Sequence, residues 1–124
     1  MYQDELMDHY HHPRHRGVLA LCDIDSGQYN PSCGDAVTIQ AKVQNDVITL
    51  IAFEGKGCVI SQATASMLAE YALHKSLEHM QDFSIDDLMQ LIKIPLGPTR
   101  LKCALLVLIA LKEGIRTYRK NKEQ

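Results

Sequence analysis

The spacing of hydrophobic positions changes several times along the chain, and the first pattern is helical. Tyr2, Leu6 and Tyr10 recur at four-residue steps, which is the spacing of one face of a short amphipathic helix. Pro13 disfavours helical backbone at the residue before it, so this helix is expected to end at or before His12. The sequence therefore predicts a short helix at the N-terminal end.

The next part of the chain carries the pattern of strands. Residues 14–31 have the composition of a loop, within which a short strand is predicted at about residues 19–24. Apolar and polar residues then alternate from 37 to 43, and a second β-rich run covers residues 47–53. Because a turn-forming Asn-Asp pair separates the two runs, they predict a β-hairpin.

Beyond Cys58 the pattern becomes helical again. Apolar residues recur at steps of three to four over residues 60–71, and two shorter helices are expected within residues 76–91, the second capped by Ser84. A last helix is predicted from about residue 101 to residue 118, apolar on all sides at its start and therefore buried there. Together these elements predict an α+β fold, in which helices pack on one face of a small antiparallel β-sheet.

Length and composition are those of one ordinary globular domain. The chain of 124 residues, 46% hydrophobic and 23% charged, is long enough to bury a core of its own, so residues 1–124 are expected to form a single domain. A net charge of −2 argues against a nucleic-acid-binding protein, which usually presents a basic face. The first residues lack the apolar stretch of an export signal, and the longest apolar run is about half a membrane span. We therefore expect a cytoplasmic protein with no membrane contact.

The four cysteines carry the candidate chemistry. No pair has the short spacing of a zinc finger or a thioredoxin motif, and a cytoplasmic compartment disfavours disulfides. Their predicted settings are more informative than their spacing. Cys33 ends a loop, Cys58 opens a helix after a glycine turn, and Cys103 is expected in the first turn of the last helix. Cys22 is interpreted as a packing residue.

Two of these thiols, Cys58 and Cys103 at predicted helix starts, have surroundings that favour an anionic sulfur. The N–H groups and dipole of a helix start favour a thiolate, and Gly34 and Gly57 leave room for a bound group to approach. Asp35 follows Cys33 by two residues and can direct its carboxylate toward the same point. Three thiolates and a carboxylate would form a four-ligand site suited to zinc or to iron in a sulfide cluster. For Cys103 alone, a place in the apolar core is the alternative.

The histidine-rich tract HYHHPRH suggests metal binding by its composition. However, the adjacent residues His11 and His12 cannot both reach one ion from a regular helix. We therefore interpret the tract as a solvated terminus.

Four segments point to one family: PSCGD, FEGKGCVISQATASML, RLKC and the opening DHYHHPRHRGVL. Together, in this order and over nearly the whole chain, they resemble the U-type iron–sulfur assembly scaffolds, the IscU/SufU/NifU N-terminal family. The resemblance implies an α+β fold of the SufE/NifU type. It also implies that Cys33, Asp35, Cys58 and Cys103 are the ligands of zinc or of a [2Fe–2S] cluster. The implied partners are a cysteine desulfurase of the IscS or SufS type and apo iron–sulfur acceptor proteins.

The region before the last cysteine departs from the scaffold members of this family. Many of them have histidine immediately before this cysteine, whereas the chain has Lys102, as in the SufU-like branch of zinc-binding sulfur-transfer proteins. That branch typically carries an insertion between the second and third cysteines, and the gap of 45 positions from Cys58 to Cys103 is closer to the IscU-like branch. In the scaffold members the motif LPPVK is recognised by a dedicated chaperone. The corresponding loop of this chain reads IPLGPTRLKC and does not contain that motif. We therefore expect no binding to the family's dedicated chaperone.

Two basic residues beside the predicted ligands are candidates for supporting roles. The Lys102 ammonium would favour the thiolate of Cys103, or it could form an ion pair with Asp35. Arg100 is a second candidate for such a role. The alternative for Lys102 is a solvent-facing position at a helix start.

Three functions are compatible with these residues. The first is a scaffold that accepts persulfide sulfur from a desulfurase and assembles a transient [2Fe–2S] cluster for transfer to apo-proteins. The second is a zinc-dependent sulfurtransferase that relays sulfur without building a cluster. In this second case Cys33 is the candidate sulfur acceptor, because its loop is expected to be exposed and because of the resemblance. The third is a structural zinc-binding module. Asp35 disfavours this function, because closed structural zinc sites typically use cysteine and histidine as ligands.

Overall fold

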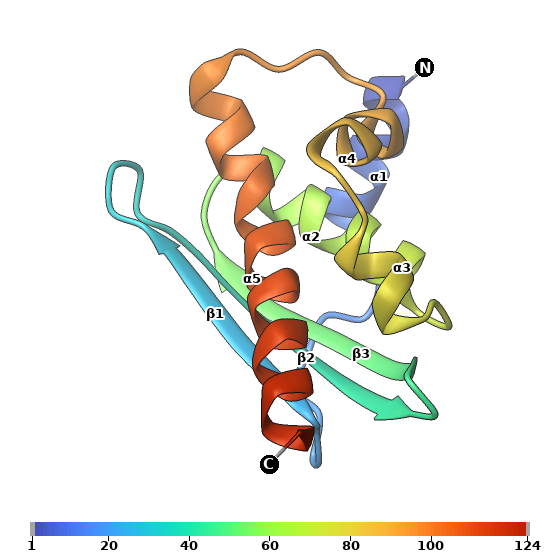
Figure 1. Cartoon of the computed structure of the whole chain (residues 1–124). Helices are drawn as coiled ribbons and strands as arrows, with labels where there is room; N and C mark the ends of the chain where they lie inside the picture. Colours follow the sequence, from blue (N-terminus) through green and yellow to red (C-terminus); the bar gives the residue numbers. More distant parts are fainter. Residues whose placement is uncertain (1, 124) are drawn as a thin grey trace.

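Three strands lie between one N-terminal helix and four C-terminal helices in the computed structural model, which describes residues 2–123. Figure 1 shows the elements in chain order. They are α1 (Tyr2–His11), β1 (Ile24–Asn30), β2 (Asp35–Gln44), β3 (Val47–Lys56), α2 (Val59–Ala72), α3 (Leu77–Gln81), α4 (Ile85–Ile92) and α5 (Pro98–Lys122).

The strands form one antiparallel sheet in the order β1-β2-β3. The predicted hairpin is β2 and β3, joined at Asn45 and Asp46, whose φ angles of 54° and 61° are those of a tight hairpin turn. The prediction of a short strand at residues 19–24 was wrong, because β1 begins only at Ile24. Its apolar alternation is weak: Ile24 is its one fully buried residue, and β1 pairs with a neighbour on one side only.

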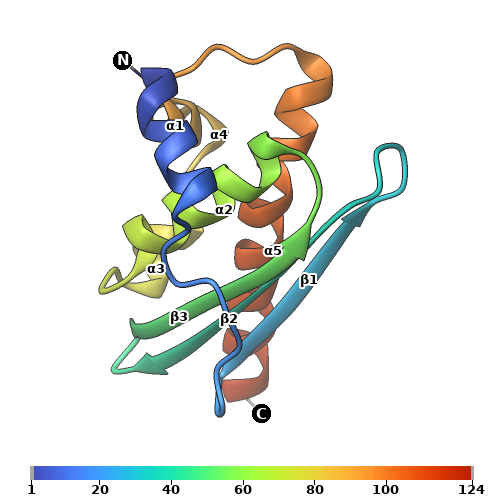
Figure 2. The same cartoon turned by 180° about the vertical axis from the view of Figure 1, so that it is seen from behind.

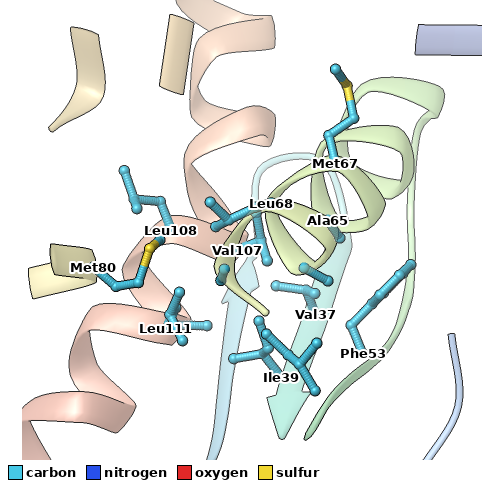
Figure 3. Packing of buried hydrophobic residues seen from close by; sticks show 14 of the residues in the cluster. Val37, Ile39, Phe53, Ala65, Met67, Leu68, Met80, Val107, Leu108 and Leu111 are labelled. Atoms are coloured by element: carbon cyan, nitrogen blue, oxygen red, sulfur yellow. The ribbon is translucent and has the colours of Figure 1, made fainter. Parts of the chain in front are cut away.

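Helices α2 and α5 cover one face of this sheet, as Figures 1 and 2 show from opposite sides. In Figure 3 Leu68 of α2 and Val107 and Leu111 of α5 point toward Ile39 of β2. These side chains belong to one continuous cluster of buried hydrophobic residues. The predicted α+β architecture, with helices on one face of a small antiparallel sheet, is therefore confirmed.

The contact between α5 and β1 depends on Gly114. A Cβ at this position would lie 2.5 Å from Cγ2 of Ile24 and 3.0 Å from Cβ of Ser26. The helix can therefore approach the edge strand closely only because residue 114 has no side chain.

Gly114→Ala is expected to lower the free energy of unfolding by about 1–3 kcal/mol, because overpacking outweighs the helix propensity of alanine, about 1 kcal/mol. Urea denaturation measures this difference, with Thr117→Ala on the exposed side of the same helix as the control. An increase in stability for Gly114→Ala would contradict this expectation and show that β1 can shift to accommodate the added methyl group.

Helix α1 docks on α2 through a different face from the predicted one. Leu6 is buried as expected, but Tyr10 is exposed and His9 is buried in its place. The side chain of Tyr2 lies outside the described residues. Nδ1 of His9 lies 2.8 Å from Oγ of Ser66, which also accepts a hydrogen bond from the backbone N–H of Arg14. Thus His9 does not share the exposure of His11 and His12, and the interpretation of a wholly solvated tract was wrong for this residue.

Burial lowers the pKa of His9, and the Arg14 guanidinium lowers it further. The unfolded chain therefore binds a proton more readily than the folded one, so the stability contributed by neutral His9 is present at high pH. We expect the free energy of unfolding to fall as pH decreases below about 6.5, the ordinary histidine value.

Denaturation of the wild type, His9→Gln and the exposed control His11→Gln between pH 5 and 7.5 checks this dependence. The His9→Gln variant should lose part of the slope of stability against pH, and His11→Gln should keep it. Equal slopes in all three proteins would show that His9 does not link stability to pH.

None of the helices within residues 2–123 combines the length and the apolar content needed to span a bilayer.

Candidate metal centre

The four predicted ligands come from three separate parts of the fold and meet beside one end of the sheet. Cys33 lies in the turn before β2, Asp35 is the first residue of β2, and Cys58 is the N-cap of α2. Cys103 comes from α5, and its Sγ lies 3.8 Å from Sγ of Cys33. The donor atoms of Cys33, Asp35 and Cys103 all lie within 4.8 Å of one another.

Asp35 is the centre of this group. Its side chain is buried, and Oδ1 accepts a hydrogen bond from the backbone N–H of Cys58 at 3.2 Å. Oδ2 accepts from Sγ of Cys58 at 3.4 Å. Cys58, the fourth predicted ligand, is therefore connected to the other three by its hydrogen bonds to the Asp35 carboxylate.

Hydrogen bonds hold the Asp35 carboxylate in its charged form. Burial alone would raise its pKa, but hydrogen bonds from Cys103, Cys58 and Cys33 outweigh burial, and the net effect is a lowered pKa. A buried carboxylate that accepts several donors is thus available as a ligand at neutral pH.

Cys103 does not have the setting predicted for it. Helix α5 begins at Pro98, with Gly97 as its N-cap, because proline needs no N–H partner at the first helical position. Cys103 consequently lies in the second turn, and the prediction of a first-turn position was wrong. Burial, followed by its hydrogen bond to Asp35, raises the pKa of the Cys103 thiol. A cation held by the group would oppose both effects and favour the thiolate.

The donor set fits zinc or iron in a sulfide cluster. Thiolate sulfur and carboxylate oxygen are both established ligands of zinc, and thiolates hold iron–sulfur clusters. Cys33 and Cys58 are exposed, whereas Cys103 and Asp35 are buried. One side of the group is therefore open to an incoming ion or protein, and the other side is packed into the fold.

Gly57 lies against the Asp35 carboxylate. A Cβ at residue 57 would lie 2.3 Å from Oδ1 of Asp35 and 2.8 Å from Oγ of Ser61, and the φ angle of 144° also favours glycine. The space beside this glycine, expected to admit a bound group, is thus taken by Asp35 itself. Gly34 has a φ angle of 76°, and a Cβ there would meet nothing within 4 Å. Its role is in the conformation of the turn.

A hollow of about 660 Å³ opens beside the three cysteines. Its remaining walls are Thr99 and Arg100 of α5 and apolar side chains from α1, the start of α2 and the loop before α5. Lys102, in contrast, does not line this hollow; its side chain is exposed. Among the ion pairs of the described residues, none joins Lys102 to Asp35.

Comparisons with known proteins agree with this fold and identify the family. The family described as NifU-like N terminal domain matches the chain over residues 1–124, so the chain belongs to this family, as the sequence motifs predicted.

Two relatives carry different functional names. The chain is 36% identical to the zinc-dependent sulfurtransferase SufU of Bacillus subtilis, over 93% of this chain and 89% of the relative. It is 30% identical to the iron–sulfur cluster assembly scaffold protein IscU of Escherichia coli, over 98% of this chain and 97% of the relative. The alignment with SufU extends over 135 positions, more than the 124 residues of the chain, so this chain has gaps relative to SufU.

Solved structures share the fold. A proposed iron–sulfur cluster assembly scaffold protein for the SUF system from Fervidobacterium islandicum superposes with a TM-score of 0.75 at 26% identity, over 90% of this chain and 94% of that one. The N-terminal part of a NifU-like protein from Brucella abortus gives a TM-score of 0.80 at 20% identity, over 96% of this chain and 94% of that one.

Proposed function

We propose that this chain is an iron–sulfur cluster assembly protein that accepts persulfide sulfur from a cysteine desulfurase and carries a transient [2Fe–2S] cluster for apo-proteins. The observation that supports this function is the convergence of three thiols on one buried carboxylate. The open side of the group suits an exchangeable cargo better than a purely structural ion, for which a closed set of ligands is typical. Membership of the NifU-like family supports the same conclusion.

Cys33 is the proposed sulfur acceptor. It is exposed on a turn, whereas Cys103 is buried and Cys58 is held to Asp35 through both its backbone N–H and its thiol. The Cys33 thiolate attacks the outer sulfur of the desulfurase persulfide, and a new S–S bond forms on Cys33. The S–S bond of the desulfurase breaks, and its cysteine leaves as a thiolate. The exchange needs no external oxidant or reductant, because one S–S bond replaces another.

The proposed role of Asp35 is to make the cargo releasable. A carboxylate is a harder ligand than a thiolate and is a poorer match for zinc or for iron bound to sulfide. The hydrogen bonds from Cys58 compete with the cargo for the carboxylate oxygens of Asp35. They can form again when the cargo leaves.

A second candidate is a zinc-dependent sulfurtransferase that relays sulfur without building a cluster. It is favoured by the 36% identity to the Bacillus subtilis protein of that name, together with lysine at position 102. The ligands and the acceptor Cys33 would be the same in both functions. They differ in the final product, which is a transferable cluster in one case and persulfide sulfur in the other.

One experiment separates these functions. The full chain is purified anaerobically, analysed for zinc, and incubated with ferrous iron, cysteine, a cysteine desulfurase and a thiol reductant, which reduces the persulfide sulfur to sulfide. A scaffold should develop the visible absorption of a [2Fe–2S] cluster and pass the cluster to an apo-ferredoxin. Zinc that resists replacement, with strong stimulation of the desulfurase, would identify the sulfurtransferase instead. Neither stimulation nor a cluster, with zinc retained in Cys33→Ser, would indicate a structural module.

A further inference from the structure

A second, smaller hollow lies beside Cys33. It has a volume of about 170 Å³, enough for a few water-sized groups at about 30 Å³ each. Four of its lining residues carry polar side-chain groups, Asn30, Ser32, Thr99 and Lys102, and the other two are Cys33 and Pro98. Of the four candidate ligands, Cys33 alone lines both this polar hollow and the larger hollow of the metal centre.

Lys102 brings a positive charge to the polar hollow. Successive residues of a helix point about 100° apart, so Lys102 and Cys103 face different sides of α5. Cys103 faces the metal centre, whereas Lys102 lines the polar hollow with Cys33. Within the described residues Lys102 takes part in none of the ion pairs, and no carboxylate lines this hollow. Its ammonium is therefore available to an anionic group on Cys33.

The backbone around Cys33 is held in place on both sides. Oδ1 of Asn30 accepts a hydrogen bond from the N–H of Ser32 at 3.0 Å, and the carbonyl of Asn30 accepts one from the N–H of Gly34 at 2.8 Å. The Cys33 side chain can consequently change its direction by rotation about one bond, between staggered rotamers, with no movement of the turn.

We propose that the polar hollow holds the outer sulfur of a Cys33 persulfide, with the Lys102 ammonium as its hydrogen-bonding and charge partner. This inference rests on the proposed function, in which Cys33 accepts sulfur. The Cys33 thiolate faces the metal centre when it acts as a ligand. Once it carries a second sulfur, the side chain turns toward Lys102, and the outer sulfur is sheltered until it is used. Lys102 is thus a binding residue for the transferred sulfur.

The test follows a Cys33 persulfide made without a desulfurase. Tetrasulfide ion gives one sulfur to the Cys33 thiolate of the full chain and leaves as trisulfide, with one S–S bond formed and one broken. After removal of the donor, a phosphine that abstracts the outer sulfur is added. Alkylation at intervals and mass spectrometry of the peptide that contains Cys33 give the half-life of the persulfide.

Four proteins are compared: the wild type, Lys102→Met, Lys102→Arg and Lys120→Met. Lys120 is an exposed residue of the same helix, about 27 Å from position 102 at 1.5 Å per residue. Loss of one charge-assisted hydrogen bond is expected to shorten the half-life about tenfold in Lys102→Met. Lys102→Arg should restore it to within about twofold, since guanidinium also donates hydrogen bonds and carries the charge. Lys120→Met should behave as wild type, and the zinc content should be equal in all four.

Equal half-lives in Lys102→Met and the wild type would overturn the inference. A similar shortening in Lys120→Met would also overturn it, because the effect would then come from the general charge of the helix. A wild-type Cys33 that takes no sulfur from tetrasulfide would contradict its role as an acceptor altogether. If tetrasulfide loads Cys33 but a desulfurase does not, the proposed function fails while the comparison of half-lives still decides the role of Lys102.

Discussion

The Asp35→Cys variant is expected to release bound zinc to a chelator at least about tenfold more slowly than the wild type, equivalent to about 1.4 kcal/mol. The physical reason is the replacement of a hard oxygen ligand by a soft thiolate that zinc and iron bind more strongly. Asp35 is already surrounded by Cys33, Cys58 and Cys103, so a thiolate there would complete a four-cysteine site. Release is measured as the rate at which a coloured chelator takes up zinc.

Two further variants test whether the rate of zinc release depends on the charged carboxylate of Asp35 in particular. Asp35→Asn keeps the shape of the side chain but loses the charge, and it should release zinc faster than the wild type. Asp25→Asn removes a carboxylate from an exposed position of β1 and should leave the rate unchanged. Faster release from Asp35→Cys would contradict the view that the carboxylate is the weakly held ligand of the site.

Gly57→Ala is expected to disrupt the metal centre without touching a ligand. The new methyl group would lie 2.3 Å from Oδ1 and 2.5 Å from Cγ of Asp35, so the carboxylate must move from its place beside Cys58. We expect zinc affinity to fall at least about tenfold, and stability to fall by about 2 kcal/mol or more from backbone strain and overcrowding. Competition with a chelator gives the affinity, and urea denaturation gives the stability.

Gly17→Ala is the matched control for this variant. The φ angle of Gly17 is 147°, close to the 144° of Gly57, but a Cβ at residue 17 would meet nothing within 4 Å. Gly17→Ala should therefore show the cost of backbone strain, about 1–3 kcal/mol, and retain wild-type zinc affinity. Wild-type zinc affinity in Gly57→Ala would mean that Asp35 does not need its observed position to bind the metal.

Most of the secondary structure was predictable because its causes are local. The hairpin of β2 and β3 follows from alternating residues and a turn, and Ser84 caps α4 with the reciprocal hydrogen bonds to Asp87 expected of a capping box. Errors occurred where a distant contact decides the outcome. Strand β1 has little apolar alternation, and its position depends on pairing with β2 and on the close approach of α5 at Gly114. Similarly, α1 buries His9 because Ser66 of α2 offers a partner.

The residue types of the candidate site were evident from the sequence. Thiols in or beside turns and a carboxylate two residues after Cys33 indicate a metal site, because these residue types are metal ligands in any fold. The motifs also identified the family that the whole-chain match then confirmed.

The arrangement of the site was decided by the tertiary structure. Residues far apart in the chain meet only when the sheet, α2 and α5 pack together, and no local pattern records that packing. The fold places the Asp35 carboxylate against the Cys58 N–H and directs Lys102 toward the polar hollow, away from the hollow that Cys103 lines. It also fills the space beside Gly57 with Asp35. Spacing along a sequence specifies neighbours within one element, whereas distances between elements depend on how their buried faces fit together.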